Sequence, residues 1–585
     1  MNKVLGVYFK NNFFLNHGID NVISCFRCGK TDDQIKIYNF DNLTLCTSEN
    51  QQSYNHFATD LNEYFYSGMI YPDHLPQEPK NTLNLQKIEH FARLYDKISS
   101  KALEQINGKF NFIVYSKDRS LKIYNDNLGL YPLFYYENND VLIFCNDYEP
   151  VLEYDKCIRE NLDKSAIIEY LLSGAPQNNK TFFKDIKILP PGSVIKASAK
   201  QIAIKRNFPV LEIKKNKLSV DAVADEYFAC FKNELNLMLA WYPDIEITLT
   251  GGADTRMILG AMSEEEKKRR TFITLSSPYV SDVENQDIQI AEILAKKYNL
   301  NHQIRRVPFF NIESVDNNYF LALRDNFTPH FSGFLGSESL RFYSPYPNNI
   351  SEVTRALITS DENVYDYYSD YFIPLDKGLN FKGKVNICLS HLKRYLNPEL
   401  CDGFTFKTLK KEILKSIEYI RSPYPEIPYT NHYLTGSFFS RHCGGARSSV
   451  LMPCYSTRNM LSPFMSPKLL EIIWSINPKL LCSEPESITY AIYKNHLPEL
   501  AEIPSNSHLG DYNNKILPKY TSGKHAIYYN EINYEAGKIF LTTDIGVYST
   551  MFNFENIKSD FFENSHNKKY IWADLFLWLN YIYKS

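Results

Sequence analysis

The sequence lacks the features that mark membrane and secreted proteins. No segment approaches the roughly 20 consecutive apolar residues that a bilayer-spanning helix needs. The apolar stretch from Val4 to Phe9 ends at Lys10, well short of the apolar core of a signal peptide. The 11 cysteines are odd in number and scattered, which favours reduced thiols over a disulfide framework. We therefore expect a soluble cytoplasmic protein that does not contact a membrane.

The sequence also lacks an excess of charge of either sign. Lys and Arg total 64 against 67 Asp and Glu, so the net charge of −3 provides no overall field for a polyanion. The 13 histidines form no HExxH pair, and Cys25 and Cys28 form a CxxC motif without a second pair. We expect neither a zinc site nor a nucleic-acid partner, and any charged ligand must be held locally.

What is present is the composition of a globular protein with more than one domain. The chain has 585 residues, of which 44% are apolar and 22% are charged. Roughly the first 205 residues contain short alternating stretches separated by turn residues, which predict an antiparallel β layer. These are Phe110 to Tyr115, Ser120 to Tyr124, Pro132 to Tyr136, Val141 to Cys145, and a hairpin from Ser193 to Lys205.

The hydrophobic period changes after a lysine-rich segment, 211–219, which we interpret as a linker. We therefore predict one domain over 1–210 and a second over 220–585. In the second domain, strands at 245–249 and 271–275 alternate with helices at 257–262 and 285–298, which is typical of a parallel α/β sheet. Beyond about residue 365 the pattern predicts mainly helices, such as 407–420, 467–475 and 487–497.

The most informative segment runs from Thr250 to Arg256, directly after a predicted strand. Gly251 and Gly252 allow a sharp turn, and the helix that follows presents free N–H groups and its positive dipole end to an anion. Asp254 would be repelled by phosphate unless a divalent cation lay between them, whereas Arg256 could donate to the same oxygens. The segment suits pyrophosphate with magnesium. The alternative is a plain strand-to-helix turn capped by Asp254.

This segment, Thr250-Gly-Gly-Ala-Asp254-Thr255, resembles the SGGxDS pyrophosphate loop of the ATP pyrophosphatases. Its context is similar to the asparagine synthetase family, which includes β-lactam synthetases and lasso-peptide cyclases. Further segments resemble that family in the same order: Asn107 to Phe110 (DGxFA), Asn125 to Tyr135 (RDxxGxxPLYY), Phe182 to Ser193 (the LPPG hairpin), Asp287 to His302, and Arg458 to Glu471 (ExRxPFLD).

The resemblance implies an α/β fold in two parts. The N-terminal part would be an Ntn-type αββα sandwich of the amidotransferase kind. The C-terminal part would be an ATP-pyrophosphatase parallel α/β domain followed by helices. It also implies ATP and Mg²⁺ as cofactors, with a carboxylate adenylated, pyrophosphate released and AMP displaced by an amine.

The residues that the resemblance assigns to this chemistry fall into three groups. The expected nucleotide contacts are Thr250, Gly251, Gly252, Asp254 and Thr255, with the main chain of Leu275 and Ser276 beside adenine. The expected metal ligands are Asp254 and Glu338. The expected catalytic residues are Arg256, Glu338 and Arg341.

Three departures from the family pattern qualify this expectation. Asn2 replaces the nucleophilic cysteine of glutamine-using members, so we expect no glutamine hydrolysis. In Ser332 to Glu338, the nearest match to SGxGxDE, only Glu338 keeps a carboxylate. The expected catalytic lysine is missing from 503–508, which leaves Lys494, Lys515 and Lys519 as the candidates to replace it.

We therefore expect an ATP-dependent amide-forming ligase that uses ammonia or an amine. Its substrate would be a small molecule or a peptide that carries a carboxylate and an amine. A homodimer or a biosynthetic partner protein stays open. Two alternatives remain: a non-catalytic or regulatory relative, and a nucleotide-activating enzyme that modifies a sulfur or RNA substrate.

Overall fold

The computed structural model describes several separate stretches of the chain. They are residues 4–10, 34–49, 54–76, 83–127, 129, 131, 133–146, 149–173, 179–206, 219–276, 281–306, 349–350, 393–397, 408, 411, 415, 461–475, 487–505 and 552–563. The predicted linker, except for Ser219, lies outside these residues. So does most of the helix expected at 407–420.

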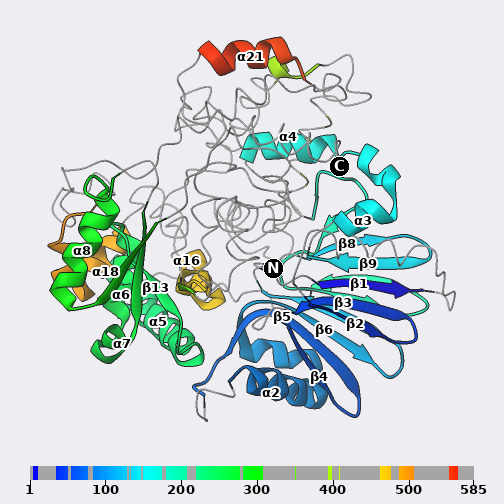
Figure 1. Cartoon of the computed structure of the whole chain (residues 1–585), viewed down its shortest axis with the longest axis horizontal. Helices are drawn as coiled ribbons and strands as arrows, with labels where there is room; N and C mark the ends of the chain where they lie inside the picture. Colours follow the sequence, from blue (N-terminus) through cyan, green and yellow to red (C-terminus); the bar gives the residue numbers. More distant parts are fainter. Residues whose placement is uncertain are drawn as a thin grey trace.

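The N-terminal part contains two six-stranded antiparallel sheets (Figure 1). The first has the order β10-β8-β9-β1-β3-β2, made of Lys187–Ile188, Phe134–Glu137, Val141–Cys145, Val4–Phe9, Leu43–Glu49 and Gln34–Asn39. The second has the order β12-β11-β7-β6-β5-β4, made of Ile202–Arg206, Ser193–Ala197, Leu121–Asn125, Ile106–Ser116, Asn62–Pro72 and Tyr54–Ala58. The strands expected at 110–115, 120–124, 132–136, 141–145 and 193–205 are confirmed to within a few residues.

Alternation along β5 divides its side chains between two cores. Phe65 belongs to the core that joins the two sheets, whereas Tyr64 and Tyr66 face helix α2 (Leu83–Ile98) on the other side. Successive side chains of a strand point to opposite faces, so a strand with apolar residues at every position is buried on both. The second sheet is therefore covered by the first sheet on one face and by α2 on the other.

Helices also lie beside the first sheet. In α3 (Glu149–Tyr154), the Tyr154 ring lies 6.0 Å from the Tyr136 ring on β8. Helix α4 (Lys164–Ser173) follows, and Asp163 begins it by accepting the N–H groups of Ser165 and Ala166. Two sheets with α2 outside one of them and α3 against the other agree with the layering that the family resemblance implies.

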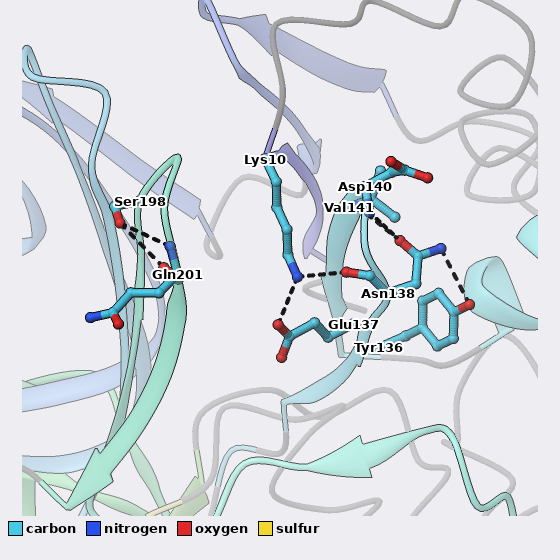
Figure 2. A network of polar contacts seen from close by, with 8 residues as sticks. All are labelled: Lys10, Tyr136, Glu137, Asn138, Asp140, Val141, Ser198 and Gln201. Carbon is cyan, nitrogen blue, oxygen red and sulfur yellow. Dashed lines mark hydrogen bonds and ion pairs between the residues drawn. The ribbon is translucent and has the colours of Figure 1, made fainter.

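Side chains fix the turns that join neighbouring strands. Between β8 and β9, the Asn138 side chain accepts the N–H groups of Asp140 and Val141, both at 2.9 Å, while Lys10 pairs with Glu137 at 2.8 Å (Figure 2). Ser198 and Gln201 close the turn between β11 and β12 in the same view. An Asn side chain that bonds to the backbone two and three residues onward stabilises a tight turn.

The motifs that resembled the amidotransferase domain meet in space. The carboxylate of Asp126, which has no exposed surface, accepts the N–H groups of Phe110 and Tyr131. The neighbouring Asn125 donates to the carbonyls of Leu189 and Pro190 and accepts the Ser193 N–H. Three motif segments far apart in sequence are therefore held together by two adjacent side chains.

The second part contains a parallel sheet. Its order is β15-β14-β13-β16, made of Asn301–Arg306, Thr271–Ser276, Glu246–Thr248 and Asn349–Ile350. The helices here are α5 (Val220–Trp241), α6 (Ala253–Ala261), α7 (Glu264–Arg269), α8 (Gln286–Tyr298), α16 (Pro467–Ser475), α18 (Ser487–His496) and α19 (Pro498–Ala501). One apolar core joins α5, α6, α8, α16 and α18 to the sheet. The parallel α/β pattern and the helices expected at 467–475 and 487–497 are confirmed.

The remaining described elements are short or peripheral. They are the 3-10 helices η2 (Ser99–Gln105), η3 (Lys156–Glu160), η6 (Lys393–Tyr395) and η8 (Pro463–Met465), and helix α21 (Phe554–Glu563). None of the described helices is long and apolar enough to cross a bilayer.

The two parts touch where β5 ends and α5 ends. Met69 and Tyr71 of β5 belong to the same apolar core as α5. Three hydrogen bonds cross here: Tyr71 Oη to Glu234 Oε2 at 3.1 Å, Trp241 Nε1 to the His74 carbonyl at 2.7 Å, and Tyr242 Oη to the Ile70 carbonyl at 2.7 Å. In Figure 1 helix α16 lies beside this junction, where Lys468 pairs with Asp73 at 3.3 Å and with Glu234 at 3.4 Å.

Candidate functional site

The loop from Thr250 to Gly252 lies at the carboxyl edge of the parallel sheet. Because Ile247 and Thr248 pair with Phe272 and Ile273 in parallel register, Thr250 is level with Leu275 at the end of β14. The Leu249 N–H donates to the Ile273 carbonyl at 2.8 Å and continues this register. Ligands of open α/β sheets bind outside this edge. The loop and the Leu275 and Ser276 main chain, both expected at the nucleotide, are therefore neighbours.

Helix α6 begins directly after the loop, and its first turn has no side-chain cap. Its N-cap residue is Gly252, which has no side chain to accept an N–H group. By contrast, Ser219, Ser263 and Asn285 cap helices α5, α7 and α8 through their side chains. Gly252 therefore supplies no oxygen acceptor at the positive dipole end of α6, which is a favourable arrangement for an anion.

The two threonine hydroxyls expected at phosphate stabilise the loop itself. Thr255 is fully buried, and its Oγ1 accepts the Thr250 N–H and lies 3.1 Å from Thr250 Oγ1. Thr250 Oγ1 in turn accepts the Gly252 N–H at 3.1 Å. In this arrangement Thr255 supports the loop from behind, whereas Thr250 is only partly buried.

Three side chains, two of them from distant segments, hold the peptide groups of Gly251. Its N–H donates to Asp287 Oδ1 of helix α8 at 2.9 Å. Its carbonyl accepts the Ser505 hydroxyl at 3.0 Å and Arg256 Nη2 at 3.3 Å. Both polar groups of one loop residue are therefore satisfied by protein, and the segment after α19 is joined to the loop.

Arg256 binds main-chain carbonyls in this structure. Its side chain is fully buried, and the guanidinium donates to the carbonyls of Leu500, Ile503 and Pro504 as well as Gly251. Burial lowers the pKa of Arg256 to about 10, so it remains charged at neutral pH. A guanidinium whose donors face main-chain carbonyls binds the 500–504 segment to α6. These contacts give Arg256 a structural role, and the catalytic role expected for it stays a prediction.

Asp254 occupies the first turn of α6 and is partly buried. The Tyr227 ring on α5 lies near it: burial and the Asp254 charge both raise the pKa of the Tyr227 phenol. The Tyr227 hydroxyl is buried and has no hydrogen-bond partner within the described stretches. A carboxylate in the first turn of a helix is favoured by the positive dipole end, and the magnesium role expected for Asp254 stays a prediction.

A second hydroxyl supports the strand below the loop. Thr274 Oγ1 donates to the Leu249 carbonyl at 2.6 Å and lies 2.7 Å from His302 Nε2. Because a hydroxyl has one proton, His302 donates through Nε2 to Thr274. Burial lowers the pKa of His302, which favours the neutral ring. His302 and Thr274 therefore fix the end of β13 from the neighbouring strands.

Two of the expected site residues lie outside the described part of the chain. Glu338 and Arg341 are there, together with Lys515 and Lys519. Lys494 is described and exposed on α18. Ile503 to Ser505 is the segment from which the family lysine is missing, and it contacts the loop. Within the described stretches no group of three or more His, Cys, Asp or Glu side chains is placed to hold a metal.

Two supports of the loop, Asp287 and Ser505, are not indicated by the motif itself. The resemblance includes Asp287 only as part of the helix from 287 onward. Its signal is the Asn285-x-Asp287 pattern, in which Asn285 Oδ1 accepts the Asp287 N–H at 3.0 Å. Ser505 gives no local signal, because its contact is with a residue 254 positions earlier.

Comparison with known proteins gives a family-model match within the N-terminal part and two relatives that match a share of the chain. A glutamine amidotransferase domain model matches residues 80–208, a range that includes the segments held by Asn125 and Asp126. The chain is 25% identical over 244 residues to asparagine synthetase [glutamine-hydrolyzing] 2 of Bacillus subtilis (strain 168), covering 38% of this chain. It is 27% identical over 127 residues to putative asparagine synthetase [glutamine-hydrolyzing] 2 of Methanocaldococcus jannaschii, covering 20% of this chain. The matches span 31% and 24% of these relatives' lengths.

Solved structures with some likeness include glutamine phosphoribosylpyrophosphate amidotransferase from B. subtilis complexed with ADP and GMP. It shares 8% identity at a TM-score of 0.23, covering 52% of this chain and 65% of that one. A structure described as the allosteric regulatory enzyme of purine biosynthesis gives 8% identity and a TM-score of 0.23, covering 53% and 82%.

Proposed function

Since the chain is a relative of the asparagine synthetases with a glutamine amidotransferase-type domain, we propose that it is an ATP-dependent ligase that forms an amide bond. In this proposal a substrate carboxylate is activated as an acyl-adenylate, pyrophosphate leaves, and an amine or ammonia displaces AMP. The observation that carries the proposal is the turn from β13 into α6. There a glycine loop and an uncapped helix N-terminus meet the end of β14 at the carboxyl edge of a parallel sheet.

The residues of this edge would divide the work of binding MgATP. The first-turn N–H groups of α6 and the Thr250 hydroxyl would hold phosphate oxygens, and the main chain of Leu275 and Ser276 would contact adenine. Asp254 and Glu338 would hold Mg²⁺, which neutralises the phosphate charge and stabilises the departing pyrophosphate. With Arg256 bound to carbonyls, the cations proposed for this reaction are magnesium, Arg341 and one of the candidate lysines Lys494, Lys515 and Lys519.

The nitrogen would come from ammonia or from an amine of the substrate. Asn2 supplies no thiol, and an amide nitrogen cannot attack the glutamine side chain as a thiolate does. The amidotransferase-type domain would then have a structural role, which its contact with α5 supports. The substrate would be a small molecule or a peptide that carries both a carboxylate and an amine.

A non-catalytic relative is the second candidate. Two observations favour it: the Arg256 guanidinium is buried against main-chain carbonyls, and Ser505 contacts the loop from the segment that lacks the family lysine. Without the cation, the charge that develops during adenylation is less stabilised. In comparable sites the loss of one such group raises the activation free energy by several kcal/mol.

Pyrophosphate release separates the two candidates. The pure protein would be incubated with MgATP, ammonium and a panel of amino acids and dicarboxylates. We expect substrate-dependent pyrophosphate, a loss of about 100-fold or more in Glu338→Gln, an unchanged rate in the exposed-residue control Glu265→Gln, and no glutamate from added glutamine. If the protein binds MgATP but releases no pyrophosphate with any substrate, the result would contradict the ligase proposal and favour the non-catalytic relative.

A further inference from the structure

Asp287 has the geometry of a fixed acceptor. It occupies the second position of α8, where Asn285 caps its N–H, and only 5% of its surface is exposed. Its Oδ1 accepts the Gly251 N–H at 2.9 Å. A bond from a backbone N–H to a carboxylate is charge-assisted, and it is stronger than one between neutral groups.

This contact changes which loop groups can bind an anion. The N–H groups of Thr250, Gly251 and Gly252 all donate to side chains, namely Thr255, Asp287 and Thr250. A phosphate that used the Gly251 N–H would have to displace a buried carboxylate of like charge. The first-turn N–H groups of α6, which the N-cap residue Gly252 does not cap, do not contact Asp287 in this way.

From this geometry we propose that Asp287 is a positioning residue. It holds the Gly251 peptide in place before nucleotide arrives, so that the triphosphate is bound by the α6 first turn and not by the Gly251 N–H. Ser505 and Arg256 hold the same residue through its carbonyl. The inference rests on the proposed ATP site and adds a residue to which neither the motif nor the comparisons assign a role.

Hydrogen exchange at single amides tests the anchor without nucleotide. Mass spectrometry with electron-transfer fragmentation resolves the Gly251 amide from that of Ala253. In the free protein we expect slow exchange at Gly251 and faster exchange at Ala253, which MgATP then slows. Exchange at Gly251 should become about 10-fold or more faster in Asp287→Ala and stay near the wild-type rate in Asp287→Asn, which keeps an acceptor oxygen.

Calorimetric titration with MgATP tests the consequence for binding. We expect Asp287→Ala to weaken binding about 10-fold and Asp287→Asn to remain within about threefold of wild type. Equal losses in the two variants would make the carboxylate charge essential, as for a metal ligand, and would overturn the positioning role. Unchanged binding by a folded Asp287→Ala protein would overturn it as well.

Two further outcomes keep the anchor and the ATP site apart. If Asp287→Ala does not fold, wild-type exchange decides: fast exchange at Gly251 in the free protein overturns the anchor, and slow exchange supports it. If wild type does not bind MgATP, the proposed function fails, and the Gly251 exchange rate still decides whether Asp287 holds the loop.

Discussion

Single charged residues of this protein serve the fold in places where their sequence context suggests chemistry. Arg256 follows a glycine loop and an aspartate, yet its guanidinium lies among four main-chain carbonyls. Three of these carbonyls belong to a segment about 250 residues later in the chain. The local motif predicts a cation near an anion, whereas the distant carbonyls that surround Arg256 leave no local signal.

At this scale we predict that Arg256→Lys destabilises the protein. Lysine keeps the charge but cannot donate to several carbonyls at once, so buried acceptors lose partners at about 1–3 kcal/mol in total. Chemical denaturation should show this loss, with Arg269→Lys on the exposed face of α7 as the control, expected within about 0.5 kcal/mol of wild type. An Arg256→Lys protein as stable as the control would contradict the structural role.

The elements were predictable where local pattern decides them and less so where packing does. The strand, loop and helix around residue 250 and the hairpin at 193–205 follow from period and turn residues. Helix α2 was not predicted as a separate element, although Ile88, Phe91, Ala92 and Tyr95 follow a helical spacing and all face the second sheet. The loop supports were missed because contacts from α8 and from beyond α19 depend on tertiary structure.

Two glycines on paired strands show how closely the second sheet is packed. Gly68 on β5 has φ +110°, and a Cβ there would lie 2.2 Å from the Lys109 carbonyl oxygen. Gly108 on β6 has φ +114°, and a Cβ there would lie 2.1 Å from the Met69 carbonyl oxygen. Both positions combine a left-handed backbone with a clash against main chain, which cannot move as a side chain can.

We therefore predict that Gly68→Ala and Gly108→Ala each lower the free energy of unfolding by about 2 kcal/mol or more. Thermal unfolding checks this. Lys196→Ala on β11 of the same sheet is the matched control, because that side chain is exposed, and we expect it within about 0.5 kcal/mol of wild type. If the two alanine variants unfold at the same temperature as the control, the strands must shift easily at these positions.

At the scale of the whole molecule, a buried carboxylate joins the two parts. Burial raises the pKa of Glu234, and Lys468 works against that rise. Burial alone would lower the pKa of Lys468, but Glu234 and Asp73 together hold it above its ordinary value. Glu234 has no exposed surface, whereas the Lys468 side chain is 44% exposed. The junction thus depends on a cation that solvent partly screens.

We predict that Lys468→Met destabilises the protein in a pH-dependent way. Without the cation the folded pKa of Glu234 rises further, so the cost of keeping it ionised grows as pH increases above its unfolded value of 4.5. The pKa of Lys468 is raised above 10.5, so this side chain stays charged throughout this pH range. After a discount for screening we expect a loss of about 1–2 kcal/mol at pH 8 and a smaller loss at pH 5.

Denaturant unfolding at the two pH values measures this effect. Lys558→Met, which removes a solvent-exposed pair with Glu555, is the control and should change stability by less than about 0.5 kcal/mol at either pH. If Lys468→Met lowers the free energy of unfolding equally at both pH values, or more at pH 5, then the ionisation of Glu234 does not determine the stability of the junction.

The central claim is that the turn from β13 into α6 binds MgATP, and calorimetric titration tests it most directly. We expect saturable binding of ATP that requires Mg²⁺ and is weakened about 10-fold or more, or at least 1.4 kcal/mol, by Asp254→Ala. Asp244→Ala, at the exposed opposite end of β13, should bind as wild type does. Absence of magnesium-dependent binding, or equal affinity in Asp254→Ala and Asp244→Ala, would contradict the account.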